Sequence, residues 1–171
     1  MKKNTWTIKI ILLAFIISFL FSALSETIMP KVNLPISILL LIIFIVVGVV
    51  FDMIGVAITT CDIKPFHSMN AKKIKYAKTG IKLIQNADKV SSFCNDVIGD
   101  ICGIISGSAG VLIATTLSLK LNIDILLTSL ITTSLIAALT IGGKALGKQT
   151  ALNNNTAIIK TFSKIVSIFQ K

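Results

Sequence analysis

Hydrophobic positions in this chain gather into long runs that are separated by short polar stretches. Four runs stand out, at residues 7–24, 34–60, 91–118 and 125–141. An α-helix needs about 20 mostly apolar residues to cross a bilayer, and only helices or closed barrels satisfy their backbone groups in lipid. A hydrophobic content of 54% over 171 residues is also too high for a soluble domain of this size. The pattern therefore predicts an all-α integral membrane protein with about four transmembrane helices.

Two further segments have the pattern of amphipathic helices that lie in the membrane interface. In residues 69–87, apolar positions recur at the helical period and lysines fill the remaining surface. Residues 155–170 repeat the pattern, with Ile158, Phe162 and Ile165 on one stripe and Lys160 and Lys164 off it. A basic helix that binds a protein or nucleic acid is the alternative for residues 69–87.

The distribution of lysines predicts the orientation in the membrane. All 17 basic residues are lysines, and most lie before the first run, between residues 64 and 89, or after residue 143. By the positive-inside rule, both termini and the helix at residues 69–87 are cytoplasmic in a multi-pass protein of the plasma membrane. Because arginine, the residue suited to bidentate base readout, is absent, we expect the partner of the lysines to be the lipid bilayer and not nucleic acid.

The first 33 residues allow two interpretations. A basic start, an apolar centre and Ala23-Leu24-Ser25 are compatible with a signal peptide and its cleavage site. The apolar run is also close to the length that spans a bilayer, which favours an uncleaved amino-terminal transmembrane helix followed by a turn.

Acidic and amide side chains interrupt two of the apolar runs. Asp96 and Asp100 are four residues apart and share a helix face, Asn95 is adjacent to Asp96, and Asp52 stands alone in the second run. Carboxylates are costly inside a bilayer, so they need a proton, a partner or a cation. The residues predict either an ion site or, for Asp96 and Asp100, a position at the water interface. For Asp52 the alternative is a protonated side chain bonded to a neighbouring helix.

Glycines near these acids predict a close helix contact. Gly99, Gly103 and Gly107 recur every four residues, and such small faces let a second backbone approach. We therefore expect them to form the contact beside the ion. We also expect Gly142-Gly143 to end the last span.

Few residues suit any other chemistry. The three cysteines are widely spaced, there is one histidine, and no nucleotide-binding or nucleophile motif is present. We therefore expect no enzyme activity and no organic cofactor.

The order of these features resembles the transmembrane domain of the cyclin M (CNNM) and CorB/CorC magnesium-transport family. The segments that carry the resemblance are Phe51 to Ala57, the lysine-rich helix, Ile98-Gly99-Asp100, and Gly143 to Lys148 followed by residues 151–154. In the family these segments are a small polar motif, a basic hairpin, an I-G-N turn and a G-E-x-x-P-K segment before a belt helix. The resemblance covers residues 34–171, with 155–170 as the belt helix.

The chain departs from the family pattern at several positions. Asp52 stands in place of a serine and Asp100 in place of an asparagine, while Ile54 and Gly55 replace serine and glutamate. Lys144 and Gly147 replace glutamate and proline. The resemblance implies a cytoplasmic site that holds dehydrated magnesium, here with carboxylates in place of hydroxyl and amide oxygens.

From the residues and the resemblance together, we expect a homodimeric transporter of divalent cations, with Mg²⁺ as the ion and Co²⁺ as a second one. The expected metal ligands are Asp52, Asn95, Asp96 and Asp100. No nucleotide partner is expected, because the nucleotide-regulated CBS-pair domains of longer relatives do not follow the belt helix. The altered positions favour the alternative of a non-transporting membrane scaffold or metal-sensing partner protein.

Overall fold

The computed structural model describes residues 2–28 and 31–169, and every regular element among them is a helix. The elements, in chain order, are α1 (Lys2–Ile28), α2 (Leu34–Thr60), α3 (Lys64–Ala71), α4 (Ala77–Gln85), α5 (Ala87–Ser92), the π-helix η2 (Phe93–Gly99), α6 (Asp100–Leu121), α7 (Ile125–Asn153) and α8 (Asn155–Phe169). Among the described residues, four continuous helical segments are long and apolar enough to cross a membrane, at 7–28, 34–60, 87–121 and 125–153. The prediction of an all-α, multi-pass membrane protein is confirmed.

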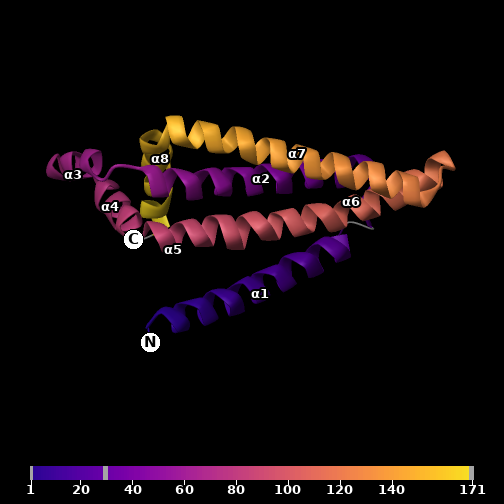
Figure 1. Cartoon of the computed structure of the whole chain (residues 1–171), viewed down its shortest axis with the longest axis horizontal. Helices are drawn as coiled ribbons and strands as arrows, with labels where there is room; N and C mark the ends of the chain where they lie inside the picture. Colours follow the sequence, from indigo (N-terminus) through magenta and orange to yellow (C-terminus); the bar gives the residue numbers. More distant parts are fainter. Residues whose placement is uncertain (1, 29–30, 170–171) are drawn as a thin grey trace.

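Three of the spans form the packed part of the molecule. The helices α2, α6 and α7 lie side by side over most of their length (Figure 1). Leu41 of α2, Ala109 and Ile113 of α6, and Ile136 of α7 are buried together between them. These small and branched side chains let the three helices approach closely.

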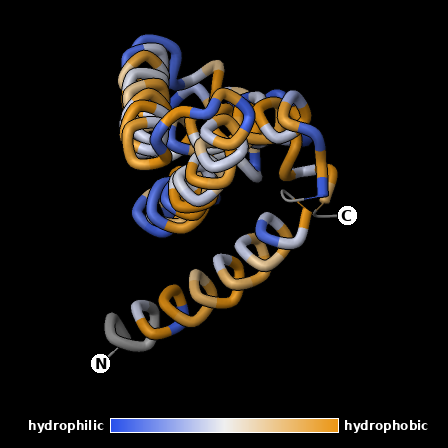
Figure 2. The backbone as a smooth tube through the Cα atoms, turned by 90° about the vertical axis from the view of Figure 1, so that its right-hand side faces the viewer, coloured by the Kyte–Doolittle hydropathy of each residue, from blue (hydrophilic) through white to orange (hydrophobic). Residues whose placement is uncertain are grey.

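The first span is attached more loosely. Ile10, Ala14 and Ile17 of α1 pack on Val97, Ile101 and Ile105 of η2 and α6. Figure 2 shows α1 as a mainly hydrophobic helix that lies beside the other elements. Ser25 near its end is buried, but its most apolar 18-residue stretch contains no buried residue, so most of its surface is left for lipid.

The amphipathic helices gather at one end of the bundle, which we call the lysine-rich end. There α8 runs across the spans, and α3 and α4 lie beside it (Figure 1). A second core holds this end together, built from Ile54, Ala57 and Ile58 of α2 with Phe66 of α3 and Ile159 of α8. The predicted belt helix at 155–170 corresponds to α8 over its described part, Asn155–Phe169.

The single helix predicted at residues 69–87 is wrong in its bounds. The segment instead contains the end of α3, then α4, and the start of α5. Lys73 has a left-handed φ of 56°, the Ile74 N–H donates to Met69 O, and the Lys73 N–H donates to Asn70 O. This bond pair is a Schellman ending, and it stops α3 before the lysine-rich turn.

Glycines in α6 and α7 also differ from their predicted roles. Gly142 and Gly143 do not end the helix of the last span, because α7 continues to Asn153. A Cβ on Gly143 would lie 3.0 Å from Val49 of α2, so this glycine serves a helix contact. Gly99 lies beside Gly48 of α2, whereas Gly103 has nothing within 4 Å of the position of a Cβ. The same is true of Gly107.

Candidate functional site

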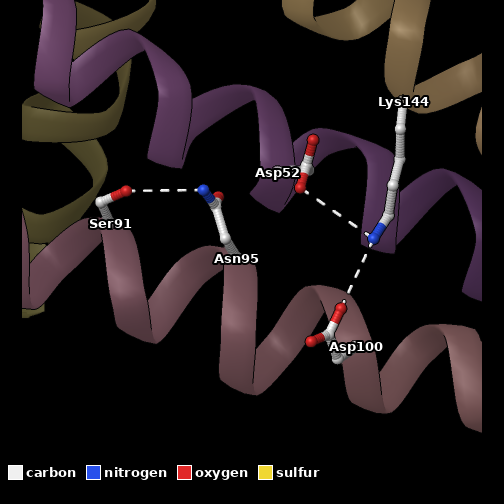
Figure 3. Close-up of polar contacts among 5 residues, drawn as sticks. All are labelled: Asp52, Ser91, Asn95, Asp100 and Lys144. Carbon is white, nitrogen blue, oxygen red and sulfur yellow. Dashed lines mark hydrogen bonds and ion pairs between the residues drawn. The ribbon is translucent and has the colours of Figure 1, made fainter.

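Two acidic residues from separate spans meet at one lysine. Lys144 Nζ of α7 lies 4.0 Å from Asp52 Oδ1 of α2 and 3.7 Å from Asp100 Oδ1 at the start of α6 (Figure 3). Both distances allow electrostatic attraction but exceed those of a hydrogen bond. The lysine therefore compensates the two carboxylates without using up their lone pairs. We call Asp52, Lys144 and Asp100 the ionic triad.

Close helix packing explains why these three side chains meet. A Cβ on Gly48 of α2 would lie 3.0 Å from Cys102 Cβ of α6, so α2 and α6 approach closely beside the triad. A Cβ on Gly99 would lie 3.8 Å from Lys144 Nζ. Gly147 lies against Val49 in the same way and brings α7 onto α2. Small residues on all three spans therefore leave room for one long lysine side chain.

The three charged groups differ in exposure. The side chains of Asp52 and Lys144 are 20% and 27% exposed, and that of Asp100 is 66% exposed. The pair of Lys144 with Asp100 is open on one side and adds little stability, because water screens it. Asp100 is thus accessible to a ligand, while Asp52 is enclosed among the helices.

The depth of the triad follows from helix geometry. At the lysine-rich end, the four spans carry their charged residues at Lys9, Asp52, Asp100 and Lys144. Near the opposite end, the corresponding charged residues are Glu26, Lys31, Lys120 and Asp124. The two levels are 17 to 21 residues apart in the four spans. A helix of that length is about 26–32 Å long, which is close to the thickness of the hydrocarbon layer. The triad therefore lies at the edge of that layer, and this depth favours the interfacial alternative for Asp96 and Asp100 over a site at the membrane centre.

Asn95 occupies a separate position next to the triad. It belongs to η2, and such π-helical turns often accompany functional sites. Its Nδ2 donates a long hydrogen bond of 3.4 Å to Ser91 Oγ (Figure 3). Its Oδ1 is buried without a hydrogen-bond partner among the described residues. The amide lies against Gly55, three residues after Asp52, where a Cβ would be 2.5 Å from Asn95 Cγ.

The fourth predicted ligand is not part of this arrangement. Asp96 is exposed on η2 and makes no hydrogen bond or ion pair to the described part of the chain. Within that part, no three histidine, cysteine or acidic residues are grouped closely enough to hold a metal ion. The structure thus brings Asp52 and Asp100 to the ammonium group of Lys144 and leaves Asp96 apart.

The sequence interpretation missed Lys144 as a member of the site. The sequence interpretation used Lys144 only as one of the lysines that predict the cytoplasmic side and as a replacement for the family glutamate. A signal was present, since Lys144 and Lys9 are the basic residues that lie at about the same helical depth as Asp52 and Asp100. The ion pair across three helices required the fold, because it depends on which face of α7 meets α2.

The three cysteines have no part in the site chemistry. Cys61, Cys94 and Cys102 are all buried and form no disulfide. Cys61 follows α2, and burial is the main cause that raises the pKa of its thiol, with the neighbouring Asp62 adding to the rise. A hydrogen bond to Thr156 opposes that rise. A protonated, buried thiol is a packing residue and a poor nucleophile.

Comparisons with family models, with curated proteins and with solved structures found no match for this chain. Fold and site together define an all-α, multi-pass membrane protein with an ionic triad among three of its spans. The resemblance to the cyclin M and CorB/CorC family stays a prediction.

Proposed function

We propose that this protein binds a small divalent cation, Mg²⁺ first and Co²⁺ second, at the ionic triad and transports it across the membrane. One observation carries the proposal: carboxylates from two separate spans converge on one positive charge at the edge of the hydrocarbon layer. Ionisable groups that face the interior of a helix bundle commonly mark ion pathways. In this proposal the metal cation binds between Asp52 and Asp100, at the position that the ammonium group of Lys144 occupies in this structure.

The donor chemistry supports a hard cation. Mg²⁺ usually keeps several waters and binds through one or two carboxylates, so Asp52 and Asp100 suffice as direct ligands. The exposure of Asp100 admits a hydrated ion. Asn95 adds a carbonyl oxygen that has no hydrogen-bond partner among the described residues and lies against Gly55, three residues after Asp52. Asp96 acts as an outer attracting charge.

The arrangement in the cell is part of the same proposal. The lysine-rich end faces the cytoplasm of a plasma membrane, as the positive-inside rule favours. The ion then enters from the cytoplasm, since the triad lies nearer that end. Two copies assemble as a homodimer.

Magnesium flux into proteoliposomes tests the proposal, with the melting temperature of the purified protein as a second readout. Asp52→Asn and Asp100→Asn should each abolish Mg²⁺-dependent flux and the stabilisation by Mg²⁺, which would reach about 2.7 kcal/mol at 100 times the dissociation constant. Asp88→Asn is the matched control, because Asp88 is exposed in α5 outside the triad. Flux that persists in both triad variants would refute the site. Failure of the wild-type protein to bind or transport any divalent ion would refute the function.

The second candidate function is a non-transporting membrane scaffold or metal-sensing partner protein. The presence of Lys144 between the two acids favours it, because a tethered ammonium already satisfies their charge. A scaffold predicts that Asp52→Asn lowers the stability of the bundle in metal-free buffer, and that Mg²⁺ shifts the melting temperature of no variant.

A further inference from the structure

An apolar hollow at the lysine-rich end has one charged side chain in its wall. It measures about 320 Å³ and lies between α2, α4, α5, η2 and α8. Its walls include Phe51, Leu83, Lys89, Val90, Phe93 and Phe162. Water would find few hydrogen-bond partners in such a space, whereas a hydrocarbon chain would bury its apolar surface against the aromatic rings.

The hollow begins at the edge of the hydrocarbon layer and continues on its headgroup side. Phe51 precedes Asp52, which we place at the edge of the hydrocarbon layer from helix lengths. From Phe51 the hollow extends along the spans toward Lys89, on the headgroup side of that level. A lipid with its chain among the phenylalanines would therefore bring its phosphate to the lysine.

The charge around the hollow selects the lipid. Residues 64–89 contain seven lysines and one acidic residue, Asp88. Each lysine near an anionic surface adds attraction for negative lipid, and Lys82 of α4 is exposed next to Leu83 in the wall. A second hollow of about 340 Å³, lined by Val50 and residues of α8, shares Phe162 but has no charged side chain in its wall. Of these two hollows, the first combines an apolar wall with a cation.

We propose that this first hollow is a binding site for one anionic phospholipid, with an acyl chain against Phe51, Phe93 and Phe162 and the phosphate at Lys89. The site is independent of the ionic triad. A bound lipid would join α2, α4, α5 and α8, and so stabilise the amphipathic helices against the spans.

Native mass spectrometry of the full chain in neutral detergent tests this proposal, with phosphatidylglycerol and phosphatidylcholine offered at equal concentration. The wild-type protein should retain one phosphatidylglycerol in preference to phosphatidylcholine. Lys89→Gln should weaken that retention about fivefold, the loss expected for one lysine near the phosphate. Lys75→Gln is the control, since Lys75 is an exposed lysine of the same end outside the hollow.

A second pair of variants separates the hollow from general charge. Val90→Trp fills the proposed site and should abolish the retention of phosphatidylglycerol. Val50→Trp fills the second hollow and should leave that retention unchanged. Circular dichroism checks that each variant keeps its helices. Equal retention of the two lipids, equal losses in Lys89→Gln and Lys75→Gln, or retention by a folded Val90→Trp would overturn the proposal. The proposal would also be overturned if the protein retained only detergent, or if a second copy of the chain occupied the hollow and no lipid was bound.

Discussion

The contact between Gly55 and Asn95 gives the sharpest test of the site geometry. An alanine at Gly55 would place its Cβ on the Asn95 amide, with 2.5 Å to Cγ and 2.9 Å to Nδ2. Real Cβ atoms do not approach other atoms this closely, so the Asn95 amide, at the end of a flexible side chain, must move aside. Gly55→Ala therefore displaces a side chain of η2 by adding one methyl group to α2.

Two opposing contributions set the expected size of the effect. Overpacking of a close contact costs about 1–3 kcal/mol, whereas replacing a helical glycine by alanine gains about 1 kcal/mol. Gly55→Ala alone should thus lower the unfolding free energy by up to about 2 kcal/mol. In an Asn95→Ala background the obstacle is gone, and the same change should raise the free energy by about 1 kcal/mol.

A double-mutant cycle in detergent micelles measures this reversal. The unfolding free energies of wild type, both single variants and the double variant should give a coupling of about 1–3 kcal/mol. The metal response supplies a functional readout, since both single variants should weaken Mg²⁺ stabilisation if the Asn95 carbonyl is a ligand. Additive effects, with Gly55→Ala costing the same with and without Asn95, would refute the inferred contact.

Three further predictions concern single residues. Lys144→Met should lower the unfolding free energy by about 1–2 kcal/mol in metal-free buffer, a value between those of exposed and buried ion pairs, and Mg²⁺ should restore it. Thermal melting measures the loss, with Lys148→Met at an exposed lysine as the control, and equal losses in the two variants would contradict a special role for the triad. At pH 7 Cys61 should react with a maleimide at least about tenfold more slowly in the folded protein than in denaturant, because its raised pKa keeps the thiol protonated. The reaction of the folded protein should become faster as pH rises, and equal rates in folded and denatured protein would contradict the burial of Cys61. Gly103→Ala should raise the unfolding free energy by about 0.5–1 kcal/mol, since nothing lies within 4 Å of the new Cβ. Gly110→Ala is the contrasting variant, because its Cβ must displace Ile136. A destabilised Gly103→Ala would contradict this prediction and show that this face of α6 is packed in the native assembly.

The sequence by itself determined the class of the protein and its spans. Apolar runs of about 20 residues have few stable forms other than helices across a bilayer, and the second predicted run coincides with α2 at Leu34–Thr60. The amphipathic stripe through Ile158, Phe162 and Ile165 likewise predicted α8. These features are local, so the order of residues is enough to find them.

Only the tertiary structure decided which faces meet. A helix that is apolar on all sides gives no periodic signal for its packed face, so the sequence wrongly assigned a contact to Gly103 and missed the ionic triad. The break after α3 was hidden as well, because a lysine, and not a glycine, takes the left-handed position at residue 73. Asp52 and Lys144 are far apart in the chain, and they meet only because glycines on α2, α6 and α7 let the backbones approach.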